Sequence, residues 1–567
     1  MKKPRSIKRI NSGNGRLIIL AIFSSMILFL ARFGYDYGFS DQDEFLPLLI
    51  RFIDSTAFSG DWFVNAQLDG FNIRLPLILT LLPLAIFVGI PATVLIVYLV
   101  SFSLLVWAVF RIGMALNGNA PAAVISAILT VSVTTLWTLG GNDIVTGMLV
   151  PSQLAWMFGL WGLVWTLEGR SIAPGILCGL AVVYQPLVGI HLTVLCTVAR
   201  LLRTWGSYRS RSFWSATKMA VLSAVWLPAT AAVTASPVLA ALIFEQMHNT
   251  ISAESIAILT QFRAPHHFIP SAFNPTMSTR FLVLFGLGGL SIWLFRGRFQ
   301  PKMRFVLVGL ILICATLLAL GFANAYWIHL DFITKLQLFK FSVSIKLFMV
   351  AAIVTCIFSV MPKSILERIG RIFSHPVTII IVTAGLAVLV GHGIRSENWT
   401  YRTIPTIFRG SAYNEFVQSD NQDARLFDWV QRNTPASAIF AIPPDYSGFQ
   451  TATRRAQFVS FKAFPYHEDD IKEWYRRLLV QTRYDTFEPG IGGVILPKVR
   501  GVEAMKQFTS YHESLSAEAL VDFARSESVD YVLRRTQVSP AAAENMLTEV
   551  YRNDNWIIYG VRKSIKN

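Results

Sequence analysis

The sequence contains little charge. Of its 567 residues only 15% are Asp, Glu, Lys or Arg, whereas 53% are hydrophobic. About a quarter of the residues are charged in an average soluble domain. The hydrophobic residues occur in runs of about 20, the length of helix that crosses the core of a bilayer. This composition excludes a soluble enzyme, a disordered chain and a disulfide-stabilised scaffold. It predicts a polytopic α-helical membrane protein with a further domain attached.

Cysteine is also scarce, and its positions exclude several kinds of site. All four cysteines lie within hydrophobic runs, and none follows residue 394. No Cys/His spacing resembles a zinc site, and no pair suggests a structural disulfide. The basic N-terminus followed by a hydrophobic run lacks a small-residue cleavage site, so we expect a retained first helix rather than a signal peptide. The cysteines are Cys178, Cys196, Cys314 and Cys356.

Nearly all of the net charge of +16 belongs to the hydrophobic part of the chain. Residues 1–394 contain 28 Lys and Arg against 13 Asp and Glu, whereas residues 395–567 contain 22 against 21. Positive residues in short loops set the orientation of a membrane protein. Nucleic-acid binding would instead require a basic stripe on a soluble face, which the sequence does not show.

The distribution of charge between the hydrophobic runs predicts the topology. Four connections are strongly basic, whereas seven of the 13 acidic residues before residue 395 lie in residues 34–70, directly after the first run. With a cytoplasmic N-terminus, about eleven spans place the basic connections inside and both the acidic loop and the C-terminal segment outside. We expect these spans near residues 17–33, 91–112, 120–139, 152–168, 171–184, 186–199, 217–235, 280–296, 305–323, 341–361 and 377–394.

Two segments are compatible with more than one topology. Residues 71–90 are long enough to span the membrane, but they contain Arg74 and two prolines, so we expect them at the outer interface. Residues 171–199 are interrupted at Tyr184-Gln185-Pro186, which predicts two short spans. The reverse choice at both segments would move Asp143 to the cytoplasmic side.

The residues after 394 are typical of a small α/β domain. Short apolar strands near 438–442, 456–461, 529–534 and 556–561 alternate with helical patterns. We therefore divide the chain into a membrane domain, residues 1–394, and an external soluble domain, residues 395–567. The expected helices are 411–432, 468–482, 498–508, 516–526 and 540–550.

The acidic run Ser40-Asp41-Gln42-Asp43-Glu44 is the strongest candidate for a functional site. It follows the first predicted span and precedes an amphipathic stretch. Carboxylates near a boundary of low dielectric can act as a base or hold a divalent cation. The composition is explained equally well by a loop without a function, whose acids are solvated and which topology alone keeps outside the membrane.

The pattern of this loop resembles the first external loop of GT-C glycosyltransferases. The resemblance rests on Asp43-Glu44, the amphipathic stretch that follows, and then Ser59-Gly60-Asp61-Trp62. The loop looks most like that of the aminoarabinose and mannosyl transferases that use polyprenyl-phosphate sugars. The resemblance covers roughly residues 15–235. It implies a membrane enzyme of the bacterial inner membrane that transfers a sugar at the external face with inversion.

The resemblance also implies roles for individual residues. Asp43 matches the acid that serves as general base or organises the site, and Glu44 is its neighbour. Asp143 lies roughly where the family has a second acid, so Asp43 and Asp143 are candidate ligands of a divalent cation, Mg or Mn, whose requirement stays open. Gln185 stands where some relatives have a Lys that contacts lipid phosphate, so another cation must neutralise that phosphate. The candidates are Arg74, Arg263, Lys335 and Lys340.

The external segment 236–279 contains the pair His266-His267, for which we weigh two interpretations. The pair contacts donor phosphate or sugar when a flap closes, or it belongs to an ordered polar loop. The expected partners are a polyprenyl-phosphate-linked sugar, a glycan, lipid or protein acceptor, and membrane lipids. Two other function classes remain open: a transporter or lipid flippase, which the spans disfavour because they are poor in charge, and a non-catalytic envelope scaffold.

Overall fold

The computed structural model describes residues 13–384 and 422–561, except 209, 211, 249–250, 300, 379, 382 and 537–546. These residues form two compact units. The first unit comprises the described residues of 1–34, 97–240 and 266–396, and the second comprises those of 35–96, 241–265 and 397–567. Both units are therefore built from separated stretches of the chain. Residues 35–70 of the predicted acidic loop fold in the same unit as the C-terminal segment.

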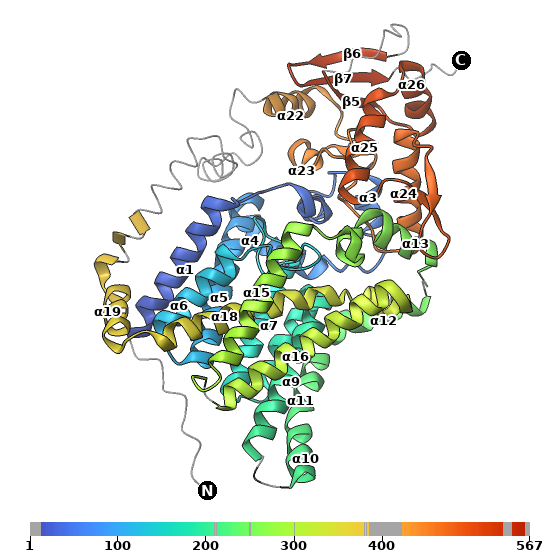
Figure 1. Ribbon diagram of the computed structural model, residues 1–567. Helices are drawn as coiled ribbons and strands as arrows, with labels where there is room; N and C mark the ends of the chain where they lie inside the picture. The colour runs from blue at the N-terminus through green and yellow to red at the C-terminus, as the bar shows by residue number, and fades with distance from the viewer. Residues whose placement is uncertain are drawn as a thin grey trace. The chain divides into compact units, whose positions relative to one another are not determined.

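The first unit consists of helices (Figure 1). One long helix, α5 (Ile90–Asn117), begins in the second unit and continues into the first. Helix α12 (Ser236–His248) begins in the first unit and ends in the second. The remaining helices of the first unit are α1 (Gly13–Arg32), α6 (Ala120–Ile128), η2 (Leu129–Val133), α7 (Pro151–Glu168), α8 (Ala173–Tyr184), α9 (Pro186–Tyr208), α10 (Phe213–Ala224), α11 (Trp226–Thr234), α14 (Pro265–Phe268), η4 (Pro270–Ala272), α15 (Pro275–Leu294), α16 (Pro301–Ala323), η5 (Asn324–Ile328), α17 (Asp331–Lys335), η6 (Leu338–Lys340), α18 (Phe341–Val360) and α19 (Lys363–Ser374).

Among the described residues, six helical segments are long and apolar enough to cross a membrane. The first ten predicted spans all overlap helices, although the span predicted at 120–139 is helical only to Val133. The eleventh, near 377–394, lies mostly outside the described residues. The predicted count of eleven is not confirmed, because several apolar helices have 10–17 residues. The six segments are Ile90–Leu116, Pro186–Tyr208, Phe213–Thr234, Pro275–Leu294, Pro301–Ile328 and Asp331–Val360.

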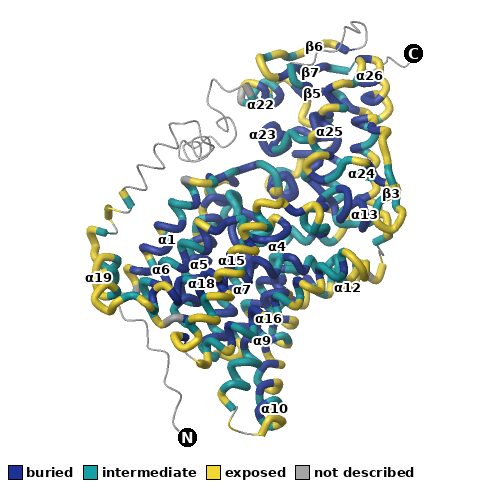
Figure 2. The backbone as a smooth tube through the Cα atoms, viewed as in Figure 1, coloured by how far each residue is buried: buried dark blue, intermediate teal, exposed yellow. Residues whose placement is uncertain are grey.

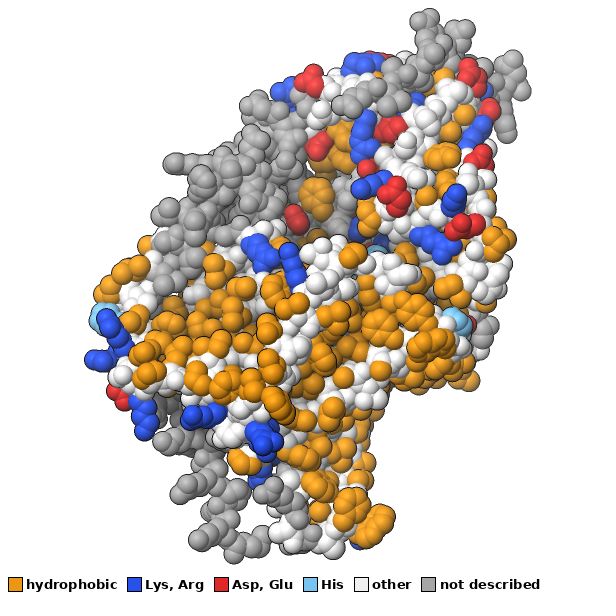
Figure 3. Space-filling view, in the orientation of Figure 1, with side chains coloured by type: hydrophobic (Ala, Val, Ile, Leu, Met, Phe, Trp, Pro, Cys, Tyr) orange, Lys and Arg blue, Asp and Glu red, His pale blue; other side chains and the backbone are white. Residues whose placement is uncertain are grey.

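Helix α18 is the most deeply buried of the membrane-spanning candidates in the described residues. This helix is buried along most of its length, as Figure 2 shows, and contacts α6, α15 and α16. Other helices carry large exposed hydrophobic side chains, among them Trp214, Leu282 and Trp293. Figure 3 shows hydrophobic side chains gathered over these helices. An apolar outer surface around a packed interior is the arrangement that lipid requires of a helical bundle.

In its described residues, the second unit combines short helices with two sheets. The acidic loop forms η1 (Ser40–Glu44) and α2 (Leu46–Ile53). The other helices are α3 (Trp62–Ala66), α4 (Leu75–Val88), α13 (Ala253–Ala257), η3 (Ile258–Arg263), α22 (Gln422–Asn433), α23 (Phe449–Thr453), α24 (Glu468–Thr482), α25 (Gly501–Ser514) and α26 (Ala517–Ser526). The strands are β1 (Ile439–Ala441), β2 (Ala456–Gln457), β3 (Phe487–Pro489), β4 (Ile495–Pro497), β5 (Tyr531–Arg535), β6 (Leu547–Arg552) and β7 (Trp556–Val561).

The larger sheet has the strand order β2-β1-β5-β7-β6. Strand β1 pairs in parallel with β2 and β5, whereas β7 pairs antiparallel with β5 and β6. Helices α22 and α26 pack against β7 (Figure 1). Because Phe262 of η3 packs edge-on or tilted against Phe461, Trp474 and Phe508, the segment before residue 265 contributes to the same core as the C-terminal helices. The α/β architecture predicted for the C-terminal segment is confirmed.

One predicted element of the C-terminal segment is wrong. We expected a helix over 540–550, but Leu547–Arg552 is strand β6. Its residues pair antiparallel with β7, in a register that matches Leu547 with Val561 and Arg552 with Ile557. The neighbouring strand decides the conformation here, because pairing and packing outweigh the modest helix propensity of such a short segment. Residues 540–546 of the predicted helix lie outside the described residues.

Candidate functional site in the second unit

The acidic run is held in a single turn of helix by local hydrogen bonds. The side chain of Gln42 accepts a hydrogen bond of 2.6 Å from the backbone N–H of Gly38, and Ser40 adopts a left-handed backbone conformation with φ 57°. Left-handed non-glycine residues are uncommon and cluster at functional sites. Asp41 is exposed, whereas Asp43 and Glu44 are buried.

Asp43 is bound by the turn that begins α23. The hydroxyl of Ser447 donates a hydrogen bond to Oδ2 of Asp43, and the backbone N–H of Gly448 donates to Oδ1 at 3.1 Å. Ser447 Oγ in turn accepts a hydrogen bond of 2.5 Å from the N–H of Ser40. Gly448 has φ 85°, and a Cβ there would lie 2.6 Å from the carbonyl oxygen of Gly38, so the turn requires glycine.

Asp43 is only 3% exposed, and this burial changes its acidity. Removal from water raises the pKa of Asp43 to about 7, despite hydrogen bonds from Ser447 and Gly448 and the nearby charge of Lys462, which lower it. The negative charge of Asp41 adds to the increase. A carboxyl group with a pKa near the operating pH suits general-base catalysis.

Glu44 is paired with Arg74, one of the cations predicted to neutralise a lipid phosphate. The guanidinium of Arg74 forms an ion pair with Glu44 and also donates a hydrogen bond to the hydroxyl of Tyr466. The carbon Cζ of Arg74 lies 5.1 Å from the centroid of the Tyr466 ring. Within the part of the chain that the structure describes, the buried Nε of Arg74 has no hydrogen-bond partner. One donor of this guanidinium thus remains for a further acceptor.

Two more cations lie in the same unit, at Arg263 and Lys462. A terminal nitrogen of Arg263 donates to the carbonyl oxygen of Lys462 at 3.0 Å, and its Cζ lies 5.2 Å from the ring centroid of Phe461. The buried Nε of Arg263 also has no partner among the described residues. Burial lowers the pKa of both Arg263 and Lys462, and the charge of Asp41 opposes this decrease in each case. A half-buried arginine with an unpartnered N–H donor can form a charge-assisted hydrogen bond with an anion.

The Gly-Asp-Trp part of the loop has a structural role. Asp61 is fully buried and caps α3 by accepting a hydrogen bond of 2.9 Å from the N–H of Val64. Its other oxygen accepts from Gln450 at 2.5 Å and from the backbone of Gln457 at 2.9 Å. Asp61 therefore connects the loop to α23 and β2.

Four of the predicted site residues thus belong to one cluster: Asp43, Glu44, Arg74 and Arg263. No pattern in the sequence predicted Lys462, Tyr466 or the Ser447-Gly448 turn, all from the segment around β2. A single Lys and a Tyr within the aromatic run Phe461-Lys462-Ala463-Phe464-Pro465-Tyr466 were the available signal.

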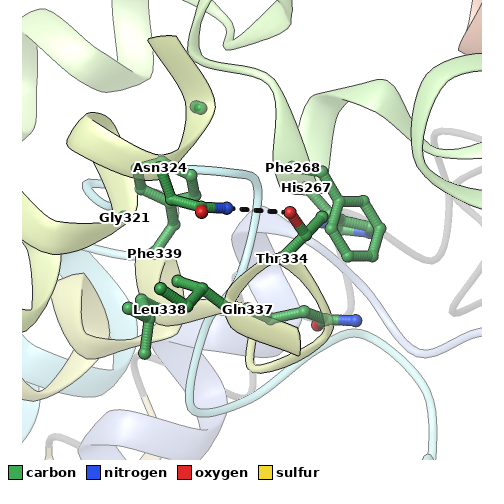
Figure 4. Close-up of a pocket in the computed structure, with 10 residues that line it drawn as sticks. His267, Phe268, Gly321, Asn324, Thr334, Gln337, Leu338 and Phe339 are labelled. Carbon is green, nitrogen blue, oxygen red and sulfur yellow. Dashed lines mark hydrogen bonds between the residues drawn. The ribbon is translucent and has the colours of Figure 1, made fainter. Parts of the chain in front are cut away.

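The other predicted site residues belong to the first unit. His267 Nδ1 lies 2.6 Å from the carbonyl oxygen of Gly140, and a Cβ on Gly141 would lie 3.8 Å from the ring of His266. His267 also lines a small pocket with Asn324, Thr334 and Gln337, in which Asn324 donates to the Thr334 hydroxyl at 2.9 Å (Figure 4). Lys335 ends α17, and Lys340 ends η6.

Gln185 marks the predicted helix break, which is confirmed. It has extended backbone between α8 and α9, and its side-chain oxygen accepts a hydrogen bond of 2.8 Å from the N–H of Val188. This contact caps the first turn of α9. The side chain of Gln185 thus has a structural role that does not depend on contact with a phosphate.

Replacing Gln185 with Ala is expected to lower the stability of the protein by about 1 kcal/mol, as loss of a helix cap does. Transfer activity, in contrast, should change less than about threefold, since the cap acts on α9 alone. Thermal unfolding of the detergent-solubilised protein and a transfer assay measure the two effects. A large loss of activity without a change in unfolding would assign Gln185 to the substrate site instead.

The residues proposed as metal ligands do not fit a divalent cation as they are arranged. Asp43 accepts hydrogen bonds from Ser447 and Gly448, and Asp143 forms an ion pair of 2.5 Å with Lys346. The described residues contain no group of three or more His, Cys, Asp or Glu side chains able to hold a metal ion. Both carboxylates are occupied by protein donors, whereas calcium and magnesium sites assemble several free oxygen ligands.

Comparison with known proteins gives a family match over a short segment. The family described as "Domain of unknown function (DUF6798)" matches residues 422–480. No curated protein matches the chain. Residues 422–480 include α22, β1, β2 and most of α24, and therefore the segment that supplies Ser447, Lys462 and Tyr466.

Among solved structures, the chain is similar to an oligosaccharyltransferase from Archaeoglobus fulgidus. The apo form gives a TM-score of 0.45 with 12% identity, over 94% of this chain and 70% of that one. The form with an inhibitory peptide and a dolichol-phosphate gives 0.41 with 12% identity, over 92% and 69%. The form with zinc and sulfate gives 0.39 with 12% identity, over 92% and 68%. At these values the similarity assigns no role to any residue.

Proposed function

We propose that this chain is a membrane glycosyltransferase of the GT-C kind, which moves a sugar from a polyprenyl-phosphate donor to an acceptor hydroxyl at the external face of a bacterial inner membrane. One observation carries the proposal: the second unit combines a carboxyl group whose pKa is about 7, Asp43, with the half-buried cations Arg74, Arg263 and Lys462. Sugar transfer needs both halves of this arrangement. A base must accept the proton of the acceptor, and cations must stabilise the leaving phosphate.

The cations suit a phosphate leaving group. When the bond between the anomeric carbon and the phosphate oxygen breaks, its electron pair stays on that oxygen and its negative charge grows. Arginine binds phosphate through paired N–H donors, and the Nε donors of Arg74 and Arg263 have no partner among the described residues. Lys462 adds a point charge beside the same acids.

Asp43 supplies the acceptor side. The acceptor oxygen attacks the anomeric carbon from the face opposite the phosphate, and its proton passes to Asp43. One displacement inverts the anomeric configuration and forms no covalent enzyme intermediate. In the structure the hydroxyl of Ser447 donates to Oδ2 of Asp43. We propose that the acceptor hydroxyl replaces this serine hydroxyl when substrate binds, so Ser447 marks the position of the acceptor.

The direct test is a transfer assay with purified protein in lipid nanodiscs, a short-chain polyprenyl-phosphate sugar and a panel of glycan, lipid and peptide acceptors. Release of polyprenyl phosphate that requires an acceptor supports the proposal. Binding of the donor without turnover, unaffected by substitution of Asp43, would instead support the scaffold function. Movement of the intact donor across vesicle membranes would support a flippase.

The pH dependence of transfer follows from the pKa of Asp43. The base is active only when ionised, and burial raises its pKa to about 7. We therefore expect kcat/KM to fall about tenfold for each pH unit below 7 and to level off above it, because kcat/KM reports the ionisation of the free enzyme. Measurement of initial rates from pH 5 to pH 9 checks this. A profile that stays flat down to pH 5 would remove Asp43 from the role of base.

A further inference from the structure

A buried ion pair in the first unit lies outside the proposed site. The ammonium nitrogen of Lys346 is 2.5 Å from Oδ1 of Asp143, and the two side chains are 0% and 3% exposed. Lys346 belongs to α18, within the membrane-spanning candidate Asp331–Val360. Ionisable groups within membrane segments are costly, and each requires a partner of opposite charge or a specific function.

The loop that carries Asp143 is built around its carboxylate. Oδ2 of Asp143 accepts a hydrogen bond of 2.5 Å from the N–H of Leu136, and Oδ1 accepts one of 2.6 Å from the N–H of Ile144. Three residues of this loop, Leu136, Gly140 and Gly141, have left-handed backbone with φ of 65–67°. The carboxylate thus holds a loop in which Leu136 adopts a conformation that is uncommon for a residue other than glycine, whereas Gly140 and Gly141 adopt it readily.

The same loop is fixed at its tip by α18 and by the histidine segment. The hydroxyl of Ser342, one helical turn before Lys346, accepts a hydrogen bond of 3.0 Å from the N–H of Leu139. The carbonyl oxygen of Gly140 contacts His267. Ser342 and Lys346 lie on one face of α18 because residues four apart project in the same direction. This face of α18 therefore binds the loop through one hydroxyl and one charge.

We infer that Lys346 is a built-in counterion that takes the place of a divalent cation on Asp143, so that wild-type protein binds no such cation at this carboxylate. A divalent cation would need to lie 2.0–2.6 Å from the carboxylate oxygen, the distance range of magnesium and calcium ligands. The Lys346 nitrogen already lies at that distance. The Lys346 ammonium repels a second cation at the same carboxylate, and this repulsion is strong in a medium of low dielectric. Lys346 thereby acts as a positioning residue of the loop 136–143.

The experiment uses Mn²⁺ as the probe and the full chain in nanodiscs, and it requires no transfer activity. Wild type, Asp143→Asn, Lys346→Ala, Lys346→Arg and Asp143→Asn/Lys346→Ala are compared by thermal unfolding and by electron paramagnetic resonance of bound Mn²⁺. We expect Lys346→Ala to unfold at a lower temperature, since it leaves a buried carboxylate unpaired. Mn²⁺ should bind this variant and raise its unfolding temperature by several degrees, because a ligand stabilises the state that binds it.

The controls separate this site from others. Lys346→Arg keeps the charge, so it should behave as wild type towards Mn²⁺. The double variant lacks both charges, so it should lose the Mn²⁺ effect and regain part of the stability. Mn²⁺ binding to wild type that Asp143→Asn abolishes would overturn the inference, as would a Lys346→Ala protein that gains no Mn²⁺ site. The wild-type and Asp143→Asn comparison decides the question even if Lys346→Ala fails to fold.

Discussion

The Asp43→Asn variant is expected to lose transfer activity by a factor of about 10²–10⁴, the usual contribution of a general base. Its unfolding temperature at pH 8 should be unchanged or higher. The two effects have one cause, the burial of an acid that must ionise to work. Burial raises the pKa of Asp43 from its ordinary 3.8 to about 7. The folded state therefore binds the proton more tightly than the unfolded chain between these values, and Asp43 destabilises the fold as pH rises through 7.

Asparagine removes this charge and keeps an oxygen that can accept the hydrogen bond from Gly448. The matched control is Asp69→Asn, an exposed acid of the same loop, which should change neither activity nor stability. Initial rates and thermal unfolding at pH 8 are measured for all three proteins. Full activity of Asp43→Asn would contradict the catalytic role. Loss of activity accompanied by unfolding would show that Asp43 only joins the loop to α23.

The Lys462→Met variant is expected to reduce kcat by about 10²–10³-fold, the effect of removing one group that stabilises developing charge. The charge on the leaving oxygen grows as the bond to the anomeric carbon breaks, so the loss falls on kcat more than on KM. Burial lowers the pKa of Lys462, opposed by the charges of Asp41 and Asp43. Methionine preserves the length of the side chain and relieves the cost of burying a cation.

The control for Lys462 is Lys498→Met, because Lys498 is exposed in the same unit. It should retain full activity, which excludes a general effect of net charge. A second comparison with Lys462→Arg distinguishes charge from shape, and partial activity is expected there. Equal activity of wild type and Lys462→Met would show that the phosphate is neutralised elsewhere, and it would leave Arg74 and Arg263 as the remaining cations of this unit's cluster.

Hydrophobic periodicity was sufficient to predict most of the architecture. The break before Pro186 and the helix at Glu468–Thr482 follow directly from composition and punctuation. Strand β6 could not be predicted in this way, because its conformation depends on pairing with β7. Long periodic segments specify their own structure, whereas short ones take the conformation that their neighbours stabilise.

The candidate site was only half predictable. The acids of η1 have a local signal, a run of carboxylates after a hydrophobic helix. Ser447 and Lys462 are brought to them by the fold of residues about 400 positions later, and no local pattern reports such contacts. Lys346 had a usable signal, since it is a single charge within a predicted span. Because a charge within a membrane segment needs a partner or a function, a search for such charges would have identified Lys346.

The most direct test of the central claim is a structure of the protein in nanodiscs with a short-chain polyprenyl-phosphate sugar, examined at the acidic loop. The proposed function predicts the phosphate beside Arg263 and Lys462, and the anomeric carbon facing Asp43 with Ser447 displaced. A donor bound away from these residues, with Asp43 still hydrogen-bonded to Ser447 and Gly448, would contradict it.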